Sequence, residues 1–187
     1  MTLKVSDWLP AFCAEVNELE LAEQGATLAE LQHIEQELGI PLPVSYKDCL
    51  RIWDGAKSFC CCWIFGIADL RETFAYYGFE PGMSEPIGAD RSFMYRGRPL
   101  GLLPFAQPEG EADLFCFDTR NWHEQEYEIA RYDHETGDVV EKYHSFAAFL
   151  QAQAWNITED LDYFMRDDRT DEAAEQLCED WSQRLRL

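Results

Sequence analysis

Three consecutive cysteines, Cys60 to Cys62, and two histidines, His134 and His144, come closest in type and spacing to a metal site. A tetrahedral zinc site needs four converging ligands, commonly two Cys-x-x-Cys pairs or cysteines combined with histidines. The cysteines lie in an apolar run over residues 60–66 that predicts a buried strand. Successive strand side chains point to opposite faces, so only Cys60 and Cys62 can converge. The histidines flank a hairpin without a placed carboxylate or thiolate, and we expect no metal site and no cofactor.

The sequence motifs do not indicate catalysis either. The sequence holds no nucleophile elbow, phosphate-binding loop, zinc-protease helix or dinucleotide fingerprint. With 36 Asp and Glu among 187 residues, nearby carboxylate pairs carry no information about acid–base catalysis. We therefore predict that the protein is not an enzyme.

The charge of the chain excludes some partners and favours others. Its 15 basic and 36 acidic residues give a net charge of -21, and nucleic acids and anionic membranes both need a basic footprint. A basic protein partner would be attracted, and the field would speed the encounter at low salt. The alternative is that the acidity only keeps the protein soluble. With 47% hydrophobic and 14% aromatic residues, the chain can bury a sizeable core.

Two helices joined by a proline-rich corner are predicted for Thr27 to Gly55. Thr27 and Glu30 form a capping box, and Gly39 ends the first helix because glycine adopts the left-handed conformation without steric cost. Pro43 suits the first turn of the second helix. The apolar stripes recur at helical spacing and comprise Leu28, Leu31, Ile34 and Leu38, then Tyr46, Cys49, Leu50 and Trp53.

This stretch resembles the opening of the SUKH superfamily. The residues that carry the resemblance are Leu31, Glu35, Leu38, Gly39, Leu42, Pro43, Tyr46, Leu50 and Gly55. Later landmarks follow in the same order: Leu103 to Ala106, a strand ending at Asp118, the turn Asp133 to Glu135, and Ser145 to Leu150. The resemblance covers about residues 27–151. It implies an α+β fold, with a curved mixed or antiparallel sheet packed with helices on one side.

The remaining elements complete a two-part plan. We predict a helix over residues 6–22, a helix begun by Asp69, an irregular surface excursion over 78–99, and strands over 102–106, 114–118, 128–133 and 139–143. A further helix begins at Ser145, and Thr158 and Thr170 each begin an amphipathic helix. Residues 1–151 form the SUKH-like domain. Residues 152–187 form a C-terminal helical extension that packs on that domain or, alternatively, against a partner or a second copy in a homodimer.

A partner-binding surface is expected where acidic residues concentrate between Glu109 and Glu141. Trp122 stands among them in a polar loop, and an aromatic anchor inside a charged rim is typical of interface hot spots. The alternative is that Trp122 folds back over the sheet above a solvated acidic face. Tyr46 and Asp54 border a pocket in one interpretation and only pack in the other. The candidate residues are Tyr46, Asp54, Glu109, Glu111, Asp113, Asp118, Trp122, Glu124, Glu126 and Asp133.

The resemblance implies a function in protein binding. Bacterial SUKH members are mostly immunity proteins encoded beside secreted toxins, so we expect a protein that neutralises a cognate toxin, such as a basic nuclease. The alternative is an intracellular regulatory or scaffold module of the SMI/KNR type, and a small-ligand sensor is a third possibility. The N-terminus lacks a signal-peptide pattern, and seven cysteines without a framework spacing indicate reduced thiols. We expect a cytoplasmic protein with no membrane or nucleic-acid partner.

Overall fold

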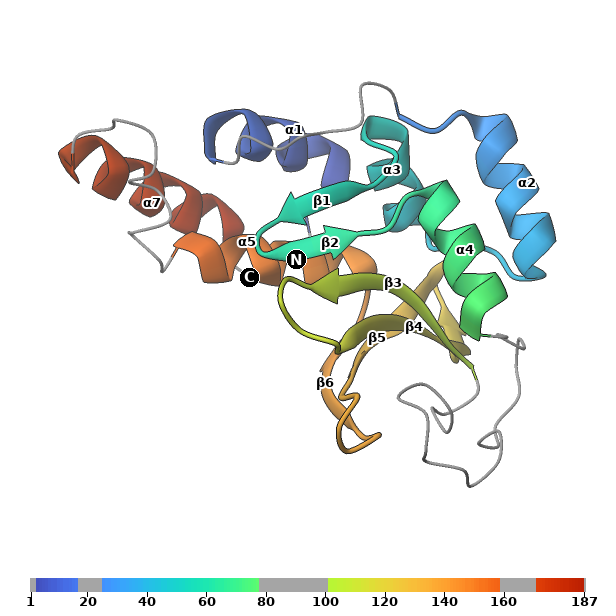
Figure 1. The fold of residues 1–187 in the computed structure, drawn as a ribbon. Coiled ribbons are helices and arrows are strands. Elements are labelled where there is room, and N and C mark those ends of the chain that lie inside the picture. Colours follow the sequence, from blue (N-terminus) through green and yellow to red (C-terminus); the bar gives the residue numbers. More distant parts are fainter. Residues whose placement is uncertain (1–2, 17–24, 78–100, 159–170, 187) are drawn as a thin grey trace.

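The computed structural model describes residues 3–16, 25–77, 101–158 and 171–186 (Figure 1). Its helices are α1 (Val5–Val16), α2 (Leu28–Leu38), α3 (Val44–Ile52), α4 (Ile67–Tyr77), α5 (Phe146–Thr158) and α7 (Asp171–Leu185). Its strands are β1 (Ala56–Phe59), β2 (Cys62–Ile64), β3 (Leu102–Pro108), β4 (Leu114–His123), β5 (Glu126–Tyr132) and β6 (Val139–Tyr143). The expected excursion over 78–99 and the helix begun by Thr158 lie largely outside the described residues, as does Thr170.

The strands form one six-stranded antiparallel sheet in the order β1-β2-β3-β4-β5-β6. Strands that neighbour in sequence are therefore neighbours in space, and the sheet twists visibly from β1 to β6 (Figure 1). The α+β fold with a C-terminal helix is confirmed, and the sheet is antiparallel.

The main core lies between the sheet and the helices, and aromatic rings fill it. Tyr46 from α3 contacts Phe105, Phe117 and Phe146 at ring-centroid distances of 5.9, 5.1 and 4.8 Å. Alternate residues of β4 and β5 face the opposite side, where Leu114 and Cys116 form a second, smaller buried cluster with neighbouring strands. Both faces of the central strands are thus buried.

The predicted helix ends in the opening stretch are confirmed. Thr27 Oγ1 accepts from the Glu30 backbone N–H, and the Glu30 carboxylate accepts from the Thr27 N–H, completing the capping box. Gly39 adopts the left-handed conformation at φ 69°. Ser145 also caps as expected, because its Oγ accepts from the Ala148 N–H at 3.1 Å.

The predicted strand over residues 60–66 exists but is shorter, because β2 covers only Cys62–Ile64. Cys60 and Cys61 have positive φ angles of 48° and 60° and form the two-residue turn between β1 and β2, where Phe59 pairs with Cys62. Both angles suit the primed turn whose twist matches that of a hairpin. The chain therefore reverses direction at the start of this run, with Cys60 and Cys62 buried and Cys61 exposed.

The expected start of α4 at Asp69 is also wrong. The helix begins at Ile67, whose N–H donates to Asp54 Oδ1 at 2.8 Å. Asp69 lies in the first turn and accepts from the Gly66 N–H at 2.9 Å. A carboxylate thirteen residues earlier in the chain therefore takes the capping position beside the helix N-terminus.

The C-terminal extension begins inside a helix, because α5 continues through residue 152 to Thr158. In the described residues α7 packs along α5 and reaches α1, where Phe12 and Trp181 meet edge to face at 5.1 Å. Trp181 Nε1 donates to Glu15 Oε2 at 3.0 Å. The division at residue 151 itself stays a prediction.

Replacing Tyr46 with Phe tests the link between α3 and Phe65, the residue that follows β2. The fully buried Tyr46 hydroxyl donates to the Phe65 carbonyl at 2.6 Å. Without the hydroxyl, this buried carbonyl loses its hydrogen-bond donor. We expect the free energy of unfolding to fall by about 1–3 kcal/mol in urea titrations. Tyr127→Phe is the matched control, since the Tyr127 ring is also buried but its hydroxyl has no hydrogen bond among the described residues. Equal effects of the two substitutions would contradict this role of Tyr46.

Candidate functional site

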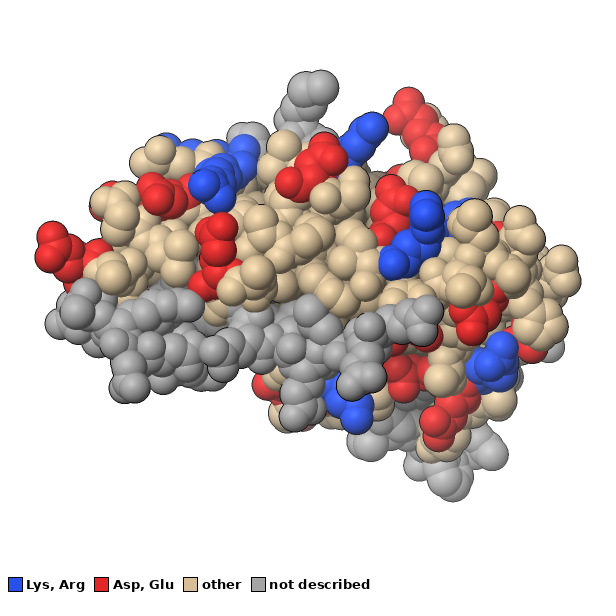
Figure 2. All heavy atoms as spheres, turned by 90° about the horizontal axis from the view of Figure 1, so that it is seen from above, with Lys and Arg blue, Asp and Glu red and all other residues tan. Residues whose placement is uncertain are grey.

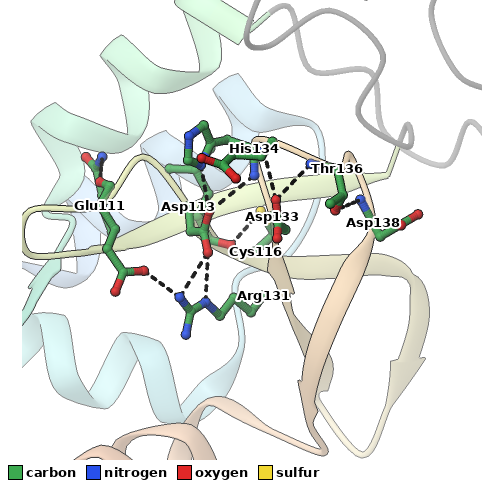
Figure 3. A network of polar contacts seen from close by, with 11 residues as sticks. Glu111, Asp113, Cys116, Arg131, Asp133, His134, Thr136 and Asp138 are labelled. Atoms are coloured by element: carbon green, nitrogen blue, oxygen red, sulfur yellow. Dashed lines mark hydrogen bonds and ion pairs between the residues drawn. The ribbon is translucent and has the colours of Figure 1, made fainter.

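Asp113 is the centre of a polar network at one end of β4 (Figure 3). Its Oδ1 accepts from the His134 backbone N–H at 3.2 Å and lies 2.8 Å from His134 Nδ1. Its Oδ2 accepts from Arg131 Nε and Nη2 at 3.1 and 2.9 Å, and Nη2 also pairs with Glu111. The network ties the loop before β4 to β5 and to the turn that follows β5.

The protonation states in this network depend on one another. Burial raises the pKa of Asp113, but hydrogen bonds from His134 and Arg131 outweigh it, and the pKa lies below its usual range. The hydrogen bond to Asp113 raises the pKa of His134 above its ordinary value of 6.5. Each partner therefore favours the charged form of the other.

Asp113, Asp133 and His134 form a group whose ligand atoms lie within 4.8 Å of one another in the described residues. Two features oppose a metal there. The Arg131 guanidinium already neutralises Asp113, and Asp133 Oδ1 accepts from the Glu135 and Thr136 N–H groups at 2.8 and 2.9 Å, which shapes the turn. The arrangement suits a polar clamp on the turn.

Several of the predicted partner-binding residues have structural contacts. Tyr46 is fully buried in the core, and Asp54 caps α4. Asp118 is only 2% exposed and is held by Arg120 Nε and Nη2, both at 2.7 Å. Burial raises the pKa of Asp118, yet the Arg120 hydrogen bonds outweigh it and the pKa is lowered.

Glu126 joins the end of the β4–β5 hairpin to α3. Its carboxylate accepts from the Ser45 backbone N–H at 2.9 Å and from Ser45 Oγ at 2.8 Å. Next to it, the Gln125 carbonyl accepts from the Val44 N–H at 3.0 Å. The hairpin thus satisfies the N-terminal N–H groups that Pro43 leaves without a side-chain cap.

Trp122 lies on β4, so the expected polar loop over 119–124 is wrong. β4 extends to His123, and Glu124 and Gln125 form a two-residue turn with positive φ angles of 50° and 65°. The Trp122 ring packs on Tyr127 with centroids 4.5 Å apart and remains 42% exposed. It partly folds back over the sheet and also presents an aromatic surface.

A surface groove of about 580 Å³ lies beside this hairpin end. We call it the hairpin groove; its lining residues are Asn121, His123, Glu124, Glu126, Glu128, His144 and Ser145. Three of them are carboxylates, and none is Lys or Arg. Glu124 and Glu128 are exposed and have no hydrogen-bond or ion-pair partner in the described part of the chain.

The structure therefore divides the predicted residues into separate regions. Glu124 and Glu126 line the hairpin groove. Trp122 lies opposite Tyr127 on the same hairpin and is not one of the lining residues. Glu111, Asp113 and Asp133 belong to the network around Arg131, and the exposed Glu109 accepts from Ser58 Oγ on β1. Sequence reasoning did not select His123, because residues 119–124 were taken for a loop. It placed Glu128 on a strand but could not foresee the groove that this residue lines.

The buried cysteines do not favour nucleophilic chemistry. Burial raises the pKa of Cys49 and of Cys62 to about 12 and that of Cys60 well above its usual range. A thiol in such a site stays protonated, whereas the thiolate is the nucleophile and metal ligand.

These features define a small α+β protein with an acidic groove and an exposed aromatic ring at the end of the β4–β5 hairpin. The model of the SMI1 / KNR4 family (SUKH-1) matches residues 25–152, more than half of the chain, and the chain belongs to this family. Among curated proteins, none matches it. No helix in the described residues has the length and apolar character to span a membrane.

The Asp113–His134 pair predicts a pH dependence of stability. A histidine whose folded pKa is raised stabilises the fold fully below its unfolded pKa, about 6.5, and loses that contribution as pH rises through the folded pKa. Urea unfolding at about pH 6 and about pH 8.5 should show this decline in the native protein. His134→Asn and Asp113→Asn should each remove it, because each deletes one partner. An unchanged pH profile in both variants would refute the coupling.

Proposed function

We propose that the protein is an immunity protein, which binds a basic toxin protein and neutralises it by occupying a functional surface of that toxin. Membership of the SMI1 / KNR4 family supports a protein-binding role at a coarse level. The observation that carries the finer proposal is the end of the β4–β5 hairpin. There Glu124 and Glu128, which have no partner in the described residues, line the hairpin groove, and Trp122 on the same hairpin is exposed.

Net charge alone does not locate the interface. Figure 2 shows acidic side chains spread over the visible face, with basic side chains between them. Many carboxylates are already neutralised within the protein, as Asp118 is by Arg120 and Glu37 by Arg71. Glu124 and Glu128 differ, because no basic side chain in the described residues pairs with them, so their charge remains available to a partner.

The end of the β4–β5 hairpin combines two contributions that tight interfaces use. Carboxylates at a rim steer a basic partner and raise the association rate. A large aromatic side chain that becomes buried on binding slows dissociation. Trp122 already rests on Tyr127, so its ring is held before binding and loses little conformational freedom.

The direct test is copurification with the product of the gene next to its own. We expect a complex that forms readily at low salt, and growth rescue when both genes are expressed together. Absence of both would refute the toxin-neutralising role. A complex with several unrelated cellular proteins and no toxin would favour the regulatory or scaffold alternative.

Neutralising the groove should slow binding of the toxin. The double variant Glu124→Gln/Glu128→Gln is expected to lower the association rate constant several-fold at low salt, and the difference should shrink as salt screens the charges. Glu172→Gln/Glu175→Gln on α7 is the matched control, with two exposed carboxylates removed elsewhere. Stopped-flow association kinetics separate the two, and equal slowing would place the interface elsewhere.

Removing the Trp122 side chain should change mainly the dissociation rate constant of the complex. Trp122→Ala is expected to weaken the complex about tenfold or more, mainly through faster dissociation. Surface plasmon resonance at two salt concentrations measures this, and the loss should persist at high salt. Unchanged dissociation would exclude Trp122 from the interface.

A further inference from the structure

A second cavity, of about 320 Å³, lies where α5 meets the end of α7. We call it the helix cavity; it is lined by Gln151, Ala152, Trp155, Leu185 and Arg186. The family match ends at residue 152, so three of these five residues lie beyond it. Its volume falls at the lower end of the range for small-molecule sites, roughly 300–1,000 Å³.

Gln151 gives this cavity an unmet hydrogen-bonding requirement. The side chain is fully buried, and its Nε2 donates to the Leu185 carbonyl at 2.9 Å. Because a carbonyl only accepts, this contact fixes the orientation of the amide. Gln151 Oε1 is then left buried without a hydrogen-bond partner. A buried acceptor without a partner lowers the free energy of unfolding, and a ligand that donates a hydrogen bond to it would recover that free energy.

The other lining residues specify what surrounds that donor. Ala152, Trp155 and Leu185 supply apolar and aromatic surface. Arg186 is exposed and has no ion-pair partner in the described residues, whereas Arg184 stacks on Trp181 at 4.8 Å. A matching ligand thus has a donor at its inner end, a flat apolar body, and a negative charge at its outer end.

We propose that the helix cavity binds a small aromatic acid, a ring with a hydroxyl or N–H donor at one end and a carboxylate at the other. The donor bonds to Gln151 Oε1, the ring packs between Trp155 and Leu185, and the carboxylate pairs with Arg186. A lining of five residues is too small for a stable protein interface, which buries about 800 Å² on each partner. The helix cavity shares no lining residue with the hairpin groove.

Three probes separate the requirements of the cavity on the full chain. Para-hydroxyphenylacetate carries both groups, phenylacetate lacks the donor, and tyramine replaces the carboxylate with an ammonium group. In NMR titrations we expect para-hydroxyphenylacetate to bind about tenfold more tightly than either of the others, as one hydrogen bond or ion pair would give. Equal affinity for the first two probes, or no binding of any probe at millimolar concentration, would overturn the proposal.

Two variants locate the binding. Ala152→Leu places a larger side chain in the cavity and should abolish binding, whereas the control Ala75→Leu, on the exposed side of α4, should not change it. Arg186→Gln should weaken both carboxylate probes and should not weaken tyramine, whose ammonium group the guanidinium repels. Circular dichroism checks the fold of each variant, and Arg186→Gln keeps the test decisive if Ala152→Leu does not fold. Full binding by a folded Ala152→Leu, or an unaltered order of affinities in Arg186→Gln, would refute the site.

Discussion

The hydrogen bonds between Glu126 and Ser45 determine where the surface features of this protein lie. A helix that begins after proline has exposed N–H groups and no side chain of its own to satisfy them. In α3 that deficit is met by a carboxylate from a hairpin that follows some eighty residues later, at 2.9 Å from the Ser45 N–H. A negative charge is favourable at that end of a helix. The contact fixes the end of β4 and β5, and with it Trp122 and the hairpin groove.

The aromatic core makes this long-range contact possible. Tyr46, one residue beyond Ser45, lies among Phe105, Phe117 and Phe146, which come from two strands and a helix. Phe105 and Phe117 stack at 4.2 Å across β3 and β4. These contacts hold the first turn of α3 next to the end of the β4–β5 hairpin. The family signature thus consists largely of residues that build the scaffold, while the hairpin groove lies downstream of the opening stretch.

The sequence revealed features whose cause is local. The capping box of Thr27, the left-handed Gly39 and the Ser145 cap each depend on residues within four positions, and all three were predicted correctly. The β1–β2 turn was missed because Cys60 and Cys61 take positive φ angles without the glycine or asparagine that normally signals such a turn. The turn at Glu124 and Gln125 was missed for the same reason, and the end of β4 was therefore predicted to be a loop. The groove could not be predicted, because it needs β4, β5 and the start of α5 together.

The acidic side chains of this protein fall into two groups, one buried and paired with arginine and the other exposed. Asp113 and Asp118 are buried, each lies against an arginine, and each has a lowered pKa, which indicates that the fold stabilises their charged forms. Their removal would therefore alter folding before it altered recognition. Glu124 and Glu128 are exposed without such partners, so a change at either position leaves the described contacts of the fold intact. Only carboxylates of the second kind can report on a partner by mutation, and the hairpin groove is where two of them lie together.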